Sequence, residues 1–509
     1  MSLRWGAAVG LAFIGGVAFA ASADRGVAAR TASGQLSVGY TSAGALASAL
    51  RAAPGTVVVR SLGALHVVEV RTRDVGPAAA ALRHAPGIRF VQRPASRVSA
   101  SDPGLTLASF TPRAVWEWQY RAIHEDSVPD AVLRAAASVR IAVIDTGADL
   151  TAPDLAAKNP LAYNTRTGTS DVRDSNGHGT FVASIAAGSV TNNDGIAGSG
   201  GDAQLLVVKA GSASGAFTDV DEAAGIMYAV DHGSRIINLS VGGPTTSTTE
   251  RRAIAYAVQH GVLVVAAVGN EYAQGNPVEY PAALLQPDGS NGIGGAGLAV
   301  TASTASGVRA SFANSGSWVS LAAPGESVFG AVSELASQAS YPRSVLPGSV
   351  AGLYGYASGT SFAAPQVSGA AALVWAAHPS LTAQQVAQIL KESASSGGHW
   401  TPELGFGVID VGAAVARAQA GTPGVLLSGS HKATRVHLSW SGDAVRYTLS
   451  FSVDGNPART MLASTQQTSA SITIARGHTY AFTVAGIDSS GATVTTSAPL
   501  TMALATARR

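Results

Sequence analysis

Nearly continuous apolar runs alternate with helix-patterned segments from Val139 to about Ala418. Strands without polar alternation are typical of parallel sheets that crossover helices cover on both faces. We therefore predict an α/β fold with a parallel sheet for this part of the chain. Sites in such sheets form where strands end and helices begin, so the residues that follow the runs are the first candidates for chemistry. The runs that we expect to form strands are 139–144, 204–208, 236–239 and 261–265.

Two different patterns flank this region. Residues 54–94 alternate strand-like and helix-like segments over a short span, which predicts a small αβ module. After Gly421-Thr422-Pro423-Gly424 the chain changes to short strands with alternating apolar positions. This spacing predicts an antiparallel β-sandwich over about residues 424–503, with Trp440 and Tyr480 in its core.

The first 23 residues have the layout of a secretory signal peptide. Arg4 precedes an apolar stretch over 5–21, and Ala21-Ser22-Ala23 provides small residues at a cleavage site. A single-pass anchor is the alternative, but glycines interrupt the apolar stretch. No later segment is long and apolar enough to span a bilayer. We therefore expect a secreted protein that has no membrane span once the signal is removed.

Composition narrows the class further. The 509 residues include 46% apolar and 13% charged residues, enough to bury sizeable cores in more than one domain. The formal net charge is only +2 and the lysines are scattered, so nothing indicates a nucleic-acid partner. Cysteine is absent, which excludes disulfides and thiolate metal sites.

Three short motifs carry candidate chemistry. Asp145-Thr146-Gly147 ends an apolar run, Asn176-Gly177-His178-Gly179-Thr180 opens another, and Gly359-Thr360-Ser361 precedes a small-residue helix with Pro365 in its first turn. A serine hydroxyl becomes a nucleophile when an imidazole accepts its proton and a carboxylate orients that imidazole. Asp145, His178 and Ser361 supply these groups. Three unrelated turns are the alternative interpretation.

In the order Asp, His, Ser, these motifs resemble those of the subtilases, a family of subtilisin-like serine proteases. The resemblance covers 139–410 most strongly. It implies a parallel-sheet subtilisin-like domain in which Asn270, after the apolar run, donates to the oxyanion beside the Ser361 backbone amide. The family pattern usually has Met where this chain has Phe362.

The resemblance also divides the chain into domains. It implies a signal peptide over 1–23, a propeptide over 24–100 with an inhibitor-like fold at about 54–94, and a peptidase domain over 101–420. Residues 424–503 resemble a fibronectin type III domain, which could bind a ligand or act as a spacer. The propeptide would be an intramolecular inhibitor, cut somewhere between Arg97 and Ser101.

Substrate contacts follow from the same resemblance. Ser240, Val241 and Gly242 match a segment that pairs with an extended substrate, and Ala267 and Gly269 match the facing side of the pocket. Glu279 matches the floor of the pocket for the residue before the cleaved bond, with Glu271 near its rim. Two carboxylates there would favour cleavage after Arg or Lys. Alternatively, both face solvent or Glu279 narrows the pocket.

A structural calcium ion is a further expectation. Asp154 matches a ligand position in the family, and the loop around Asn193 resembles the partner loop, although it is one residue shorter. Turn chemistry explains the Asn-Asn-Asp-Gly run equally well.

Other classes remain open at this point. An esterase would need the final glycine of a G-x-S-x-G elbow, which 359–363 lacks. A sedolisin-like acid protease would use a carboxylate where this chain has His178. A catalytically silent binding protein is the third alternative. The preferred interpretation is a monomeric, self-processing serine endopeptidase that acts on protein or peptide substrates.

Overall fold

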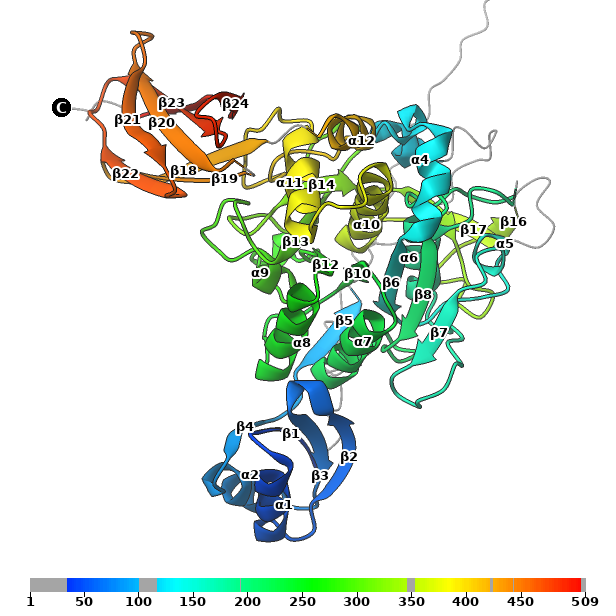
Figure 1. Cartoon of the computed structure of the whole chain (residues 1–509). Helices are drawn as coiled ribbons and strands as arrows, with labels where there is room; N and C mark the ends of the chain where they lie inside the picture. Colours follow the sequence, from blue (N-terminus) through cyan, green and yellow to red (C-terminus); the bar gives the residue numbers. More distant parts are fainter. Residues whose placement is uncertain are drawn as a thin grey trace, which may run out of the picture.

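The computed structural model describes residues 34–99, 117–192, 194–345, 353–421, 424–442 and 444–504. These residues form a central α/β body, an N-terminal αβ body and a C-terminal β body; in Figure 1 the N-terminal body lies below the central one and the C-terminal body at its upper left. The predicted signal peptide and the predicted cleavage region after Ser99 lie outside the described residues. None of the described helices is long and apolar enough to cross a membrane.

The central body is built on a seven-stranded sheet whose neighbouring strands are all parallel. The strand order is β14-β13-β12-β10-β6-β8-β7, so the chain crosses over between most strands. This confirms the predicted fold class. The strands are β6 (Arg140–Asp145), β7 (Leu161–Asn164), β8 (Gln204–Lys209), β10 (Ile236–Leu239), β12 (Leu263–Ala267), β13 (Gly297–Ser303) and β14 (Leu321–Pro324).

Helices cover both faces, which explains the continuous apolar runs. Along β6, Ile141 and Val143 enter one core, whereas Ala142 and Ile144 enter the other. The first core also contains residues of α6 (His178–Ala187), α10 (Thr360–Ala377), α11 (Ala383–Ser393) and α12 (Val411–Ala420). The second contains residues of α7 (Asp219–Asp231) and α8 (Thr248–Gln259).

Shorter elements complete the central body. β15, β16 and β17 form a small antiparallel sheet, and β5, β9 and β11 form another. The remaining bounds are α3 (Trp118–Ala122), α4 (Asp130–Ala135), α5 (Pro153–Ala156), α9 (Ala282–Leu285), β5 (Ser96–Ser99), β9 (Ala216–Thr218), β11 (Val241–Gly242), β15 (Val328–Ala331), β16 (Ser344–Val345) and β17 (Leu353–Ala357).

The N-terminal body is a four-stranded antiparallel sheet with two helices, and it starts earlier than the expected residue 54. Its order is β2-β3-β1-β4, so β1 is an inner strand. Ser37 and Gly39 break the apolar pattern of β1, and long-range pairing with β3 and β4 provides the order that the local sequence lacks. The elements are β1 (Gln35–Tyr40), α1 (Ala43–Ala52), β2 (Val57–Leu62), β3 (Val67–Arg71), α2 (Val75–His84) and β4 (Ile88–Gln92).

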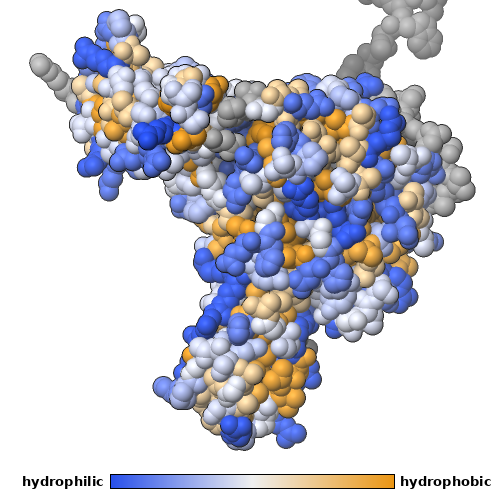
Figure 2. Space-filling model, viewed as in Figure 1, coloured by the Kyte–Doolittle hydropathy of each residue, from blue (hydrophilic) through white to orange (hydrophobic). Residues whose placement is uncertain are grey.

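This body packs on α7 and α8 of the central body. Leu62, Leu65 and Val67 belong to the same buried cluster as residues of these helices. Arg60 Nη1 lies 2.8 Å from Asp221 Oδ1, and Arg252 Nη1 donates to the Leu65 carbonyl at 2.9 Å. Apolar residues also gather on the outer side of this body in Figure 2, over β2, where valines 57–59 are exposed. The N-terminal body is thus bound by both packing and charge.

The C-terminal body consists of two antiparallel sheets packed together, as predicted. Trp440, Tyr480 and Phe482 are buried between them. One sheet contains β18 (Val425–Lys432), β19 (Arg435–Gly442) and β22 (Ser469–Thr473). The other contains β20 (Arg446–Val453), β21 (Arg459–Thr465), β23 (Thr479–Ile487), β24 (Thr493–Thr496) and β25 (Leu500–Ala503).

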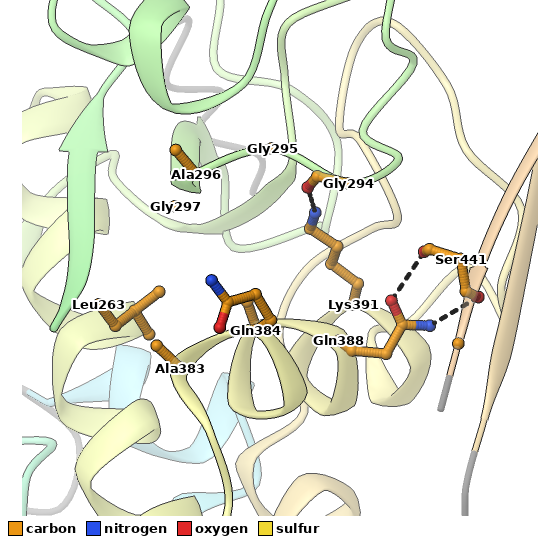
Figure 3. Close-up of a pocket in the computed structure, with 12 residues that line it drawn as sticks. Leu263, Gly294, Gly295, Ala296, Gly297, Ala383, Gln384, Gln388, Lys391 and Ser441 are labelled. Atoms are coloured by element: carbon orange, nitrogen blue, oxygen red, sulfur yellow. Dashed lines mark hydrogen bonds between the residues drawn. The ribbon is translucent and has the colours of Figure 1, made fainter. Parts of the chain in front are cut away.

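Helix α11 joins the C-terminal body to the central one. Ser441 Oγ donates to Gln388 Oε1 at 2.9 Å, and Gln388 Nε2 donates to the Ser441 carbonyl at 3.3 Å. Figure 3 shows this pair beside Lys391, in a pocket that Gly294 also lines. The Lys391 ammonium is buried and donates to the Gly294 carbonyl at 3.0 Å. The pocket is therefore part of the junction between the two bodies.

Candidate active site

Asp145 and His178 meet at the edge of the sheet where parallel strands end. Asp145 is the last residue of β6, and His178 is the first residue of α6 after Gly177, whose φ is 101°. The His178 Nδ1 lies 2.8 Å from Asp145 Oδ1, and both side chains are almost fully buried. The Thr146 backbone N–H donates to the same carboxylate oxygen at 2.7 Å. This geometry orients the histidine ring with Nδ1 toward Asp145 and Nε2 on the opposite side of the ring.

Asp174 holds the turn that carries His178, and sequence analysis missed it. Its Oδ1 accepts from the Gly177 backbone at 2.9 Å and from the Thr146 hydroxyl at 2.9 Å. Its Oδ2 accepts from the Thr180 backbone at 2.8 Å and from the Thr180 hydroxyl at 2.6 Å. The carboxylate is fully buried and ties the two motifs together. In the sequence it is one of several polar residues in an apparent turn.

Gly179 is required because its backbone lies close to that of Gly147. A Cβ at this position would lie 2.2 Å from the Gly147 carbonyl oxygen and 3.1 Å from the Asp145 Cβ. No side chain fits at that separation, so the glycines of the two motifs allow the carboxylate and imidazole turns to pack together.

Ser361 lies at the start of α10, and the residue after it packs near the His178 ring. The ring of Phe362, the following residue, is centred 5.6 Å from that of His178. The Ser361 hydroxyl donates to the Ser240 carbonyl at 3.1 Å, and the Ser240 hydroxyl donates to the Ser361 carbonyl at 2.7 Å. A helix N-terminus also directs backbone N–H groups and a partial positive charge toward this point. The three motifs thus meet in one region, with the helix start that carries Ser361 beside the Asp145–His178 pair.

Asn270 follows β12 and faces the same helix start. Its side-chain oxygen accepts from the Thr360 backbone N–H at 2.9 Å and from the Thr360 hydroxyl at 3.0 Å. Because the backbone N–H can only donate, these contacts direct the Asn270 oxygen toward Thr360 and its NH₂ group away from it. Thr360 therefore orients Asn270, a role that no sequence pattern indicated.

Strand β5, which Figure 1 labels between the N-terminal and central bodies, pairs with β9 on one side and β11 on the other. Gly242 pairs with Val98 and Val241 pairs with Ser99 on one side. On the other side, Arg97 pairs with Phe217. The predicted substrate-binding strand, which Ser240 precedes, thus pairs in antiparallel fashion with a segment of the same chain.

Glu279 lies between the two predicted walls of the pocket. A Cβ at Gly242 would lie 2.2 Å from Glu279 Oε2, and a Cβ at Gly269 would lie 2.8 Å from the same atom. The side chain is buried rather than exposed to solvent. Burial raises the pKa of Glu279 to about 8, and the neighbouring Glu271 carboxylate, with which it shares a hydrogen bond, adds to the rise. Ala267 is the last residue of β12 and lies two positions before Gly269 in the chain.

The Asp154 carboxylate, a predicted calcium ligand, is held by protein hydrogen bonds. Asp154 is buried, and its Oδ1 accepts from the Ile196 backbone at 3.0 Å while its Oδ2 accepts from the Tyr354 hydroxyl at 2.8 Å. Protein donors thus fix the orientation of this carboxylate. No three His, Asp or Glu side chains gather as a metal site within the described ranges. Asn193 itself lies outside those ranges.

Comparisons with known proteins agree with this geometry. The model of the subtilase family, Peptidase S8, matches residues 136–407, and the model of the fervidolysin N-terminal prodomain matches residues 20–93. Subtilisin E of Bacillus subtilis (strain 168) is 32% identical over 283 residues, which are 54% of this chain and 65% of that protein. The chain therefore spans slightly less than two thirds of that relative.

Two further relatives extend the match. The alkaline protease of Alkalihalobacillus alcalophilus is 31% identical over 347 residues, 68% of this chain and 78% of that protein. The crystal structure of fervidolysin from Fervidobacterium pennivorans, described as a keratinolytic enzyme related to subtilisin, matches with a TM-score of 0.65. At 20% identity, covering 89% of this chain and 86% of that one, it shows a shared fold. Since the family model covers more than half of the chain, the chain belongs to the subtilase family.

Proposed function

We propose that this chain is a secreted serine endopeptidase that first cleaves its own N-terminal prodomain. Ser361 is the nucleophile and His178 the general base, which Asp145 orients. Asn270 and the Ser361 backbone N–H donate to the oxyanion. The observation that carries the proposal is the pairing of β5 with β11, because it brings an extended segment of the chain next to Ser240 and Ser361.

The proposed mechanism uses groups that are already close together. The Ser361 hydroxyl turns from the Ser240 carbonyl toward His178 Nε2, loses its proton there and attacks the peptide carbonyl carbon. The carbonyl oxygen becomes negative and accepts from Asn270 and the helix N-terminus. His178 then donates its proton to the leaving amine, and water hydrolyses the acyl-enzyme by the same proton transfers.

The strand register supports a cut one residue beyond β5, within the expected range of 97–101. Val98 is opposite Gly242 and Ser99 is opposite Val241, so a strand that keeps this register brings its next residue opposite Ser240. We propose that the Ala100–Ser101 bond is cleaved. A cut after Arg97 would require the strand to shift by three residues.

The test is the N-terminus of the secreted product. The full-length chain and Ser361→Ala are expressed in parallel, and each product is measured by intact mass spectrometry. We expect the wild type to begin at Ser101 and the variant to keep its prodomain. Casein hydrolysis should fall by about 10⁶-fold in the variant, the magnitude measured for a subtilisin.

Other outcomes identify the rival functions. Processing of both chains at the same bond would indicate an external protease. Absence of casein hydrolysis by a correctly processed wild type would favour a silent binding protein or an esterase. A short ester substrate then separates these two.

We propose a preference for Arg or Lys before the bond, to be tested against a preference for small residues. The Glu271 and Glu279 pair supports the basic preference, because a cation could replace their shared proton. The position of Glu279 between Gly242 and Gly269 supports the small residue, as does the identity of Ala100. Profiling a peptide library with the processed enzyme decides between them.

Secretion is the remaining part of the proposal. The apolar stretch over 5–21 and the small residues at 21–23 support it. Deletion of residues 2–23 should retain the protein inside the expressing cell, whereas the full chain should appear in the medium.

A further inference from the structure

Arg97 is a fully buried arginine whose guanidinium contacts carboxylates from two different helices. Its Nη2 donates to Glu250 Oε2 at 2.6 Å and its Nε donates to Glu250 Oε1 at 3.3 Å. The Nε also lies 3.8 Å from Glu222 Oε2. The side chains of all three residues are at most 1% exposed. Burial of a charge is costly unless it is paired, and here the pairing is bidentate.

The first turns of α7 and α8 form the pocket. Asp219 and Glu222 lie at the start of α7, which Thr218 caps, and Glu250 lies at the start of α8, which Ser247 caps. The partial positive charge at a helix N-terminus stabilises first-turn carboxylates. The Thr246 hydroxyl donates to Glu250 Oε2 at 2.6 Å and holds that carboxylate in place. Both helices belong to the part of the chain that remains after the proposed cut.

The pocket contains more acidic groups than one arginine needs. Both Glu222 side-chain oxygens are buried without a hydrogen-bond partner among the described residues. Burial raises the pKa of Glu222, and the neighbouring Glu250 adds to this, while Arg97 lowers it. Burial also raises the pKa of Asp219 to about 6. Removal of the prodomain would leave these three acids facing an empty pocket.

The pocket shape suits a planar guanidinium. A Cβ at Gly243 would lie 3.3 Å from Arg97 Nη1 and 3.4 Å from its Cδ, so the absence of a side chain there admits the arginine. Arg97 Nη1 also donates to the Ser96 carbonyl at 3.1 Å. A lysine has a single ammonium and cannot donate to both Glu250 oxygens in this fork geometry.

Resting on the proposed function, we propose that Glu222, Glu250 and Asp219 form a specificity pocket for arginine in substrates. The recognised arginine immediately precedes the substrate residue that pairs with Gly242. Arg97 has this position in the prodomain, because Val98 pairs with Gly242. The enzyme would therefore prefer extended peptides that carry Arg at the fourth position before the cleaved bond. In self-processing, Arg97 is the arginine at this position.

Peptides test the proposal with the processed wild-type enzyme. Four fluorogenic peptides share the sequence of residues 95–103, with Arg, Lys, Leu or Glu at the position of Arg97. We expect kcat/KM for the Arg peptide to exceed that for Leu by about 100-fold, because a desolvated, hydrogen-bonded charge pair is lost. Lys should lie between them and Glu should be the poorest substrate.

Variants then assign the preference to the pocket. Glu250→Leu should reverse it, so that the Leu peptide is cleaved faster than the Arg peptide. Glu222→Gln, a milder change in case Glu250→Leu does not fold, should reduce the ratio by about tenfold. Asp231→Asn removes the same charge from the exposed end of α7 and should leave the ratio unchanged.

The outcomes separate the two proposals. Equal cleavage of the Arg and Leu peptides by the wild type overturns the arginine pocket and leaves the endopeptidase assignment intact. Absence of cleavage of every peptide and of casein overturns both. An Arg preference that Glu250→Leu does not alter also overturns the pocket, because the selectivity would then arise elsewhere.

Discussion

Two acidic pockets lie along β11, and they keep their buried carboxylates in opposite ways. Around Arg97, Glu250 binds a guanidinium through both oxygens. Between Gly242 and Gly269, the Glu279 carboxyl pairs with Glu271, and burial raises its pKa to about 8. The first pocket thus holds a cation, whereas the second holds a proton at neutral pH.

The difference shows that charge type alone does not define a specificity pocket. Removing a carboxylate from water is costly, and either a paired cation or protonation avoids that cost. A proton leaves the pocket able to accept a neutral residue, while an arginine fork requires a matching partner. The two pockets therefore make different predictions for substrate and pH.

Both pockets should bind residues of one substrate whose cleaved bond lies at Ser361. Asn270→Ala should reduce kcat by about 10² to 10³-fold, a magnitude measured in a subtilisin, because one oxyanion donor is lost. The reduction should be the same for peptides with Arg in the first pocket and for peptides with Leu there. Steady-state kinetics on both peptides provide the measurement, and a loss confined to one peptide would contradict a shared centre.

Removal of the buried Arg97 cation should destabilise the fold far more than substitution of the protonated Glu279. In a Ser361→Ala background, which prevents cleavage, Arg97→Leu should lower the free energy of unfolding by about 3 kcal/mol, because Glu250 stays buried without its partner. Urea denaturation followed by fluorescence measures this change. Arg93→Leu, which removes an exposed arginine nearby, is the control.

The second pocket should respond to pH in the range where Glu279 titrates. Cleavage after Lys or Arg needs ionised Glu279, so its kcat/KM relative to cleavage after Ala should rise up to about tenfold per pH unit and level off above about pH 8. Parallel pH profiles of peptides that differ only at this residue test the trend. A flat ratio would show that Glu279 does not contact the residue before the bond.

The stability of the same group provides the smallest effect. Because the folded-state pKa of Glu279 lies above its usual value, the unfolded chain ionises first as pH rises above about 4.5, and this destabilises the fold up to about pH 8. Glu279→Gln has no such penalty. Both proteins carry Ser361→Ala, and we compare their melting temperatures with and without Glu279→Gln. The melting temperature of the Glu279→Gln protein minus that of the Glu279 protein should rise from pH 5 to pH 8. A constant difference would argue against the raised pKa.

Sequence reasoning succeeded where chemistry is tied to a local signal. The α/β class follows from uninterrupted apolar strands, and Asp145, His178, Ser361 and Asn270 each lie within two residues of a glycine and next to an apolar segment. The structure pairs His178 with Asp145 and places Phe362, the residue after Ser361, near the His178 ring. Their catalytic roles stay predictions until the variants are measured.

The rest depends on contacts between distant residues. Arg97 and Glu250 are separated by 153 positions, and neither stands out in a local window. Asp174 resembles an ordinary turn residue, although it fixes the histidine turn. Strand β1 was missed because its order comes from pairing with β3 and β4 rather than from its own pattern.

Under the proposed function, the three-stranded sheet around β5 has a consequence for which proteins can be substrates. Neighbouring strands are about 4.8 Å apart, so β9 and β11 leave a slot about 10 Å wide when β5 is gone. An α-helix is about that wide with its side chains, and its backbone groups are already paired. Only a segment that has detached from its own fold can enter. The proposed rate of attack on a native protein should therefore follow how often its chain opens locally, so conformational instability in the target would set the rate of cleavage.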